Sequence, residues 1–138
     1  FGVGHIGGTL SVMDALTVIY YSKAKNLNPD NPNEPNRDRI IMSKGHAGPA
    51  MYVVLADLGY FPKDWLSTLN KNGTNLPSHC DRLKTPGIDM TAGSLGQGLS
   101  VAVGMAQAAK LDGNPATVYC IIGDGGTDLG GEYVRRLP

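Results

Sequence analysis

The feature that most constrains the fold is an apolar run that leads directly into an acidic glycine turn. Residues 118–122 are apolar or aromatic, and Gly123-Asp124-Gly125-Gly126 follows them without a break. Such a run is typical of a buried strand in a parallel sheet. In α/β proteins, ligands bind beyond the carboxyl ends of these strands. We therefore expect Asp124 to lie at a ligand-binding edge.

The acidic turn also indicates a particular ligand chemistry. The single carboxylate of Asp124 cannot retain a hard divalent cation alone, but it can bridge one to a diphosphate whose other oxygens rest on backbone N–H groups. The turn therefore suggests a diphosphate cofactor with a metal. A structural alternative stays open, in which Asp124 only caps the helix that follows.

Composition and charge narrow the class of protein. The 19 glycines among 138 residues are roughly twice the average share, and such enrichment marks turns and loops that approach a ligand. Twelve basic and twelve acidic side chains cancel, so net charge favours neither nucleic acid nor a membrane surface. No apolar stretch approaches the ~20 residues of a spanning helix. Cys80 and Cys120 stand far apart in unlike settings, which fits a reducing compartment and a cytoplasmic protein.

Periodicity and turn residues predict a single α/β domain over residues 1–138. Ser11 and Asp14 resemble a helix capping box. Pro49 suits a first helical turn, and Gly59 suits a helix C-terminus. The alternation of helices and strands indicates a parallel sheet flanked by helices. The predicted helices span residues 11–21, 48–58, 62–69 and 95–111, and the predicted strands span residues 39–42 and 117–122.

Two polar segments lack the periodicity of packed elements. We expect a surface loop over residues 26–36 and a functional loop over residues 71–91, because structureless loops of the latter length are unusual in compact domains. The charged residues 37–39 are interpreted as a solvated cluster at a strand start. Phe61 and Trp65 are expected in the core or at an interface.

All three histidines lie beside glycine or serine in predicted loops. His5, His46 and His79 are absent from apolar helical faces, which weakens the usual interpretation of a core histidine. Imidazoles can donate hydrogen bonds to phosphate and sugar oxygens and exchange protons near neutral pH. For any one of them, a simple loop or capping role stays open. Zinc binding is not favoured, because their spacings match no known ligand pattern.

A glycine-rich segment, residues 93–98, opens the last predicted helix. Taken alone it is weak evidence, because glycines at a helix entry can serve close packing only. It is not the dinucleotide fingerprint, since no apolar strand ends immediately before it.

Five motifs together resemble those of transketolases, in the same order and over nearly the whole chain. The resemblance is to the short or split bacterial and archaeal transketolases, and it implies an incomplete N-terminal section with a thiamine-diphosphate-binding fold. The motifs are Gly4-His5-Ile6-Gly7-Gly8-Thr9-Leu10-Ser11, Asn36-Arg37-Asp38-Arg39, Ser43-Lys44-Gly45-His46-Ala47, Thr91-Ala92-Gly93-Ser94-Leu95-Gly96-Gln97-Gly98 and Gly123-Asp124-Gly125.

The resemblance implies a cofactor and a reaction. The cofactor would be thiamine diphosphate, held through Mg²⁺ or Ca²⁺ at Asp124, with Gly123 and Gly125 approaching the diphosphate. Gly93 and Leu95 match positions that meet the aminopyrimidine and thiazolium rings. The reaction would transfer a two-carbon ketol unit from a ketose phosphate to an aldose phosphate.

The resemblance also implies roles for the histidines. His46 matches a histidine that reaches the diphosphate and the substrate side. His5 and His79 match histidines that line the donor-sugar channel, where they would stabilise oxygens and shuttle protons. All three are therefore candidate catalytic residues.

Departures from the family pattern indicate a fragment or a degenerate copy. Leu129 stands where the family has a glutamate, Phe1 begins almost inside the first motif, and the paired asparagines of the metal site are absent. The pyrimidine-binding domain would have to come from a partner domain or subunit in a homo- or hetero-oligomer. A non-catalytic remnant or interaction module is the alternative from another class. Deoxyxylulose-phosphate synthase and dihydroxyacetone synthase are alternatives within the family.

Overall fold

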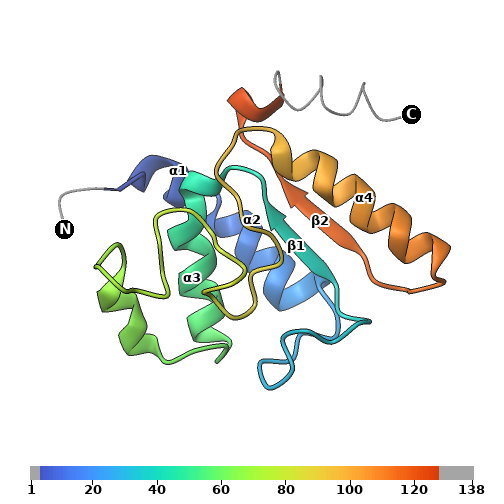
Figure 1. Ribbon diagram of the computed structural model, residues 1–138, viewed down its shortest axis with the longest axis horizontal. Coiled ribbons are helices and arrows are strands. Elements are labelled where there is room, and N and C mark those ends of the chain that lie inside the picture. The colour runs from blue at the N-terminus through green and yellow to red at the C-terminus, as the bar shows by residue number, and fades with distance from the viewer. Residues whose placement is uncertain (1–3, 128–138) are drawn as a thin grey trace.

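The computed structural model describes residues 4–127 (Figure 1). Among these residues, no helix has the length and apolar character needed to cross a membrane. In chain order the elements are α1 (Ile6–Leu10), α2 (Met13–Val18), the π-helical turn η1 (Ile19–Lys23), β1 (Arg39–Met42), the 3-10 turn η2 (Gly45–Ala47), α3 (Gly48–Asp57), the 3-10 helix η3 (Lys63–Thr68), α4 (Gln97–Leu111) and β2 (Val118–Ile121).

The two strands form a parallel sheet, as the sequence predicts. β1 pairs with β2 in a register that sets Arg39 opposite Val118 and Met42 opposite Ile121. α4 packs against both strands, and Figure 1 shows α2 and α3 on the side of β1 away from β2. The described residues therefore form a sheet flanked by helices, and both strands end at the same edge.

The hydrophobic core is centred on α3. This helix is apolar on most of its surface, and such a helix is stable only when several neighbours cover it. Leu16 of α2 and Ile40 of β1 are fully buried with it. Pro49 lies in its first turn and Gly59 follows its C-terminus with a φ of +89°, as predicted. Phe61 is buried and stacks on Trp65 with ring centroids 5.4 Å apart, which confirms the core prediction.

The first predicted helix is wrong at both ends. α1 already ends at Leu10, and Ser11 forms its C-terminal cap instead of an N-terminal one. The Ser11 hydroxyl donates back to the Gly8 carbonyl at 3.1 Å, so it is not available to cap α2. Helical structure then resumes at Met13 and continues through η1 to Lys23. At α4, the start moves to residue 97 because Gly96 has a φ of +78°.

The prediction of a solvated charge cluster at residues 37–39 is also wrong. Arg37 and Asp38 are only 2% and 3% exposed. The Arg37 guanidinium forms an ion pair with Asp89, and the backbone N–H of Thr117 donates to Asp38 at 2.7 Å. The partners lie far away in the sequence, so local pattern gives no sign of them. The network ties the end of the 71–91 loop to the start of β1.

Candidate functional site

The candidate site lies at the carboxyl ends of β1 and β2. The segment Ser43-Lys44-Gly45-His46 follows β1, and the acidic turn follows β2. The backbone N–H of Ser43 donates to the carbonyl of Ile121 at 2.8 Å, which extends the strand pairing to this edge. Parallel strands bring such loops together where α/β proteins bind ligands.

Three separate segments bring the histidines together at this edge. His5 precedes α1, His46 lies in η2, and His79 lies in the 71–91 loop. The ring of His5 lies 5.3 Å from that of His46 and 6.2 Å from that of His79, between centroids. A side chain at Gly48 would meet the Ser78 carbonyl oxygen at 3.1 Å, so α3 and the His79 loop pack closely. The three imidazoles therefore share one space.

Two glycines permit the close approach of the site loops. A Cβ at Gly8 would lie 2.8 Å from Cδ2 of His46, so any larger residue would displace that imidazole. A Cβ at Gly45 would lie 2.9 Å from the carbonyl carbon of Ala92, which is backbone and cannot rotate away. Glycine at these positions is therefore a packing requirement.

The acidic turn faces the glycine-rich entry to α4. A Cβ at Gly125 would lie 3.9 Å from Cδ1 of Leu95, and one at Gly126 would lie 3.6 Å from the backbone nitrogen of Gly96. Leu95 is 38% exposed, and Gly93 and Asp124 are exposed as well. An apolar side chain and a carboxylate thus stand side by side at the open edge, where both could contact one ligand.

The charge state of His46 follows from its surroundings. Partial burial lowers its pKa below the ordinary value of 6.5, and the charges of His5, Lys44 and His79 lower it further. The carboxylate of Asp124 acts in the opposite direction. His46 is therefore neutral at pH 7, with one ring nitrogen able to donate and the other able to accept a hydrogen bond.

The donor set fits a ligand that carries its own metal contacts. Within residues 4–127 there is no group of three or more His, Cys, Asp or Glu residues that could hold a metal ion. One exposed carboxylate, imidazoles and the Lys44 ammonium nevertheless suit a phosphate and a hard cation bound together. Sequence reasoning assigns no role to Lys44, although a cation between a strand end and a glycine turn is a usable signal. Leu129, where the family has glutamate, lies outside the described residues.

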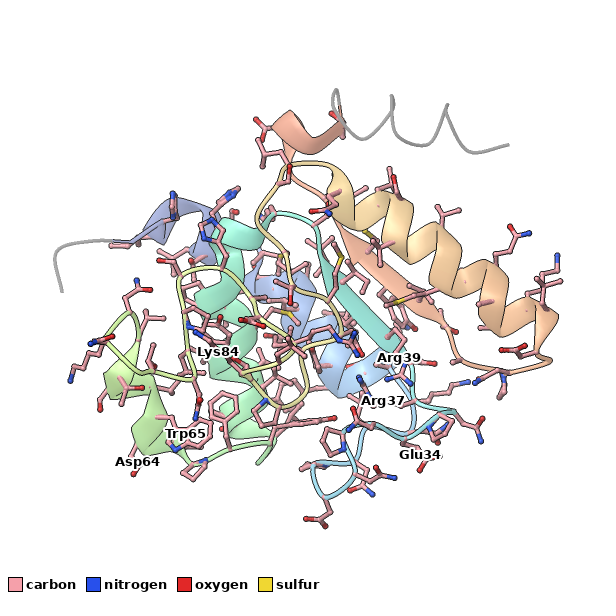
Figure 2. The ribbon with its side chains drawn as sticks, in the orientation of Figure 1. Glu34, Arg37, Arg39, Asp64, Trp65 and Lys84 are labelled. Atoms are coloured by element: carbon pink, nitrogen blue, oxygen red, sulfur yellow. The ribbon has the colours of Figure 1, made fainter. Side chains whose placement is uncertain are left out.

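A separate groove lies at the opposite end of the sheet. It has a volume of about 610 Å³, and Arg37, Arg39, Asp89, Lys84 and α4 contribute to its walls. Figure 2 shows Arg37 and Arg39 at the lower end of β1, away from the carboxyl edge. Ligands of α/β sheets bind at the carboxyl ends of strands, so this groove is not the candidate site.

Comparison with known families and sequences gives a consistent result. The sequence profile of the family described as "Transketolase, thiamine diphosphate binding domain" matches residues 1–130. A 6-deoxy-6-sulfo-D-fructose transketolase subunit from a Clostridium species is 57% identical over 94% of this chain and 46% of its own length. One of the two apulose-4-phosphate transketolase subunits of Actinobacillus succinogenes is 42% identical over 97% of this chain and 48% of its own length. The chain spans about half the length of these relatives.

Solved structures share the fold. The transketolase from Leishmania mexicana superposes with a TM-score of 0.78 and 30% identity, over 94% of this chain and 22% of that chain. The transketolase from Campylobacter jejuni gives a TM-score of 0.76 and 33% identity, over 87% of this chain and 20% of that chain.

Proposed function

This chain belongs to the transketolase N-terminal, thiamine diphosphate-binding family, and we propose that it forms the diphosphate-binding part of a transketolase that transfers a two-carbon ketol unit. The observation that carries the proposal is the meeting of three imidazoles and the Asp124 turn at one sheet edge. Donors for sugar oxygens and a carboxylate for a metal are the groups that this reaction needs near its cofactor.

Several residues would hold the cofactor. Asp124 would bind Mg²⁺ or Ca²⁺ through its exposed carboxylate, and Gly123 and Gly125 would let the backbone approach the diphosphate. Gly93 and the exposed Leu95 would contact its rings. Thiamine diphosphate, when bound, supplies a carbon nucleophile and an electron sink.

The histidines would act on the donor sugar. His5 and His79 are exposed and would donate hydrogen bonds to sugar oxygens, which orients the ketose and stabilises developing charge. His46, neutral at pH 7, would accept a proton from a sugar hydroxyl at its free ring nitrogen and return it later.

The substrates would be anionic ketoses and aldoses, and a partner would complete the site. The relatives are named for a sulfonated and a phosphorylated sugar, so a negatively charged terminal group is the shared chemistry. Both relatives are named as subunits, which supports a second subunit or domain that contributes the pyrimidine-binding half. Cys80 and Cys120 are free thiols, and we expect a cytoplasmic location.

Replacement of Asp124 by asparagine tests this proposal in the complete two-part enzyme. We expect Asp124→Asn to lower Mg²⁺-dependent affinity for thiamine diphosphate, measured by calorimetry, by at least about 100-fold, because even outer-shell changes cost about 10–100-fold. Ketol transfer should fall with it. Asp64→Asn, at an exposed carboxylate in η3, is the matched control and should change neither. Full turnover by the Asp124 variant would overturn the assignment.

A further inference from the structure

Among the described residues, Lys44 is a cation inside the candidate site without a carboxylate partner. It is half-buried, and its ammonium donates to the Ser11 hydroxyl at 3.0 Å. The ion pairs among residues 4–127 join other residues: Arg37 and Arg39 with Asp89, and Lys63 with Asp57. An ammonium has three donors, and one neutral hydroxyl satisfies only one of them. Lys44 therefore has unused charge and unused donors at the site.

The backbone on both sides of Lys44 is fixed. Ser43 before it is paired to Ile121 across the sheet, and Gly45 after it packs against the backbone of Ala92. The side chain itself runs along the acidic turn, since a Cβ at Gly123 would lie 3.5 Å from both Cβ and Cδ of Lys44. The base of this side chain is thus held beside the turn, and only its outer part is free to turn.

The position of the ammonium places positive charge between two groups of the site. Its charge acts on His46 from the same segment, and the carboxylate of Asp124 acts on the same imidazole. A metal at Asp124 and an ammonium from Lys44 would approach the turn from different elements. This arrangement suits a ligand with more than one negative charge, because each cation can neutralise a different oxygen.

We propose that Lys44 is a further cofactor-binding residue, whose ammonium leaves Ser11 to bind phosphate oxygens of thiamine diphosphate beside the Gly123 turn. The inference rests on the function proposed above. It assigns the diphosphate two separate sources of positive charge, the metal at Asp124 and the lysine that follows β1. Ser11 holds the ammonium in place when no phosphate is present.

Four variants of the complete enzyme test this inference by calorimetric titration with thiamine diphosphate and Mg²⁺. Lys44→Met should weaken binding about tenfold at low salt, and the loss should shrink at high salt, because a charge contact is screened. Lys44→Arg should recover most of the affinity. Ser11→Ala removes the hydrogen-bond partner but keeps the charge, so its affinity should stay within about twofold of the original. Lys110→Met, at an exposed lysine near the end of α4, is the control and should change nothing.

The outcomes separate this inference from the proposed function. If Lys44→Met binds as the original protein does while Asp124→Asn does not bind, the inference is wrong and the proposed function stands. If Ser11→Ala loses as much affinity as Lys44→Met, or if the loss is independent of salt, Lys44 acts only by packing and the inference is also wrong. If the unmodified enzyme does not bind thiamine diphosphate, the proposed function itself fails.

Discussion

At the scale of single residues, the candidate site is governed by the charges around His46. Three positively charged or ionisable neighbours, His5, Lys44 and His79, add to partial burial in lowering its pKa. Only Asp124 is identified as acting in the other direction among the described residues. The protonation of one imidazole therefore reports on the whole edge, including the two groups proposed to bind the diphosphate.

The pKa of His46 should respond in opposite directions to two substitutions. In metal-free protein, Asp124→Asn removes an anion and should lower the His46 pKa further, whereas Lys44→Met removes a cation and should raise it. Titration of the imidazole by NMR measures both changes. A shift of both variants in the same direction would contradict the arrangement of charges described here.

The same shift predicts a pH dependence of stability. Because folding lowers the His46 pKa below 6.5, the unfolded chain binds more protons just below that pH. The contribution of this residue to stability is therefore complete above pH 6.5 and is lost as the pH falls from 6.5 through the lowered value. His46→Gln, which does not titrate, should flatten this part of the curve of unfolding free energy against pH.

At the scale of elements, local pattern predicts the regular segments and fails where distant residues decide. Residues 39–42 form β1 as predicted, because an apolar run with a polar flank is a local signal. Arg37, by contrast, is buried by a carboxylate 52 positions away at Asp89. No short window of the sequence contains both partners, so local pattern predicts an exposed cluster where the folded chain has a buried one.

The candidate site shows the same division. Chemistry in the loops around His5, His46 and His79 can be predicted from their glycine and serine neighbours, and the roles come from the family resemblance. Their gathering into one space depends on the parallel pairing of β1 with β2 and on glycine contacts between loops. Such contacts form only in the folded chain, so the sequence pattern does not reveal Lys44 as a neighbour of the acidic turn.

The long loop at residues 71–91 is packed, and two glycines allow its packing to be measured. Both Gly73 and Gly87 have positive φ, +76° and +84°. A Cβ at Gly87 would lie 2.7 Å from atoms of Leu55 and Tyr60 in the core, whereas one at Gly73 would meet nothing within 4 Å. The two positions therefore share backbone strain and differ in crowding.

Replacement of each glycine by alanine should separate these two costs. Gly73→Ala should lower the free energy of unfolding of the complete protein by about 1–2 kcal/mol through left-handed backbone strain alone. Gly87→Ala should cost about 1–3 kcal/mol more, because the buried neighbours must move. Urea denaturation followed by circular dichroism measures the difference. Equal losses would mean that the loop does not pack on the core as described.

At the scale of the whole molecule, the described residues leave one side of the fold open. All four residues of β2 are only half-buried, whereas Ile40 to Met42 of β1 are buried. On α4, Val103 and Leu111 are 39% and 79% exposed. The chain spans about half the length of its relatives. We therefore expect further polypeptide of the complete protein to cover this side.

The isolated 138 residues should then behave differently from the complete protein. An unpaired apolar sheet edge promotes association, so the isolated polypeptide should bind a hydrophobic dye and grow in mass with concentration in light scattering. Val103→Lys should reduce both effects in the isolated polypeptide by placing charge on the exposed face. In the complete protein the same change would bury an unpaired charge and should lower the free energy of unfolding by at least about 2 kcal/mol. If the isolated polypeptide is monomeric and binds no dye, or if Val103→Lys leaves the complete protein unchanged, this face is not covered, because a covered face cannot accept the charge without loss.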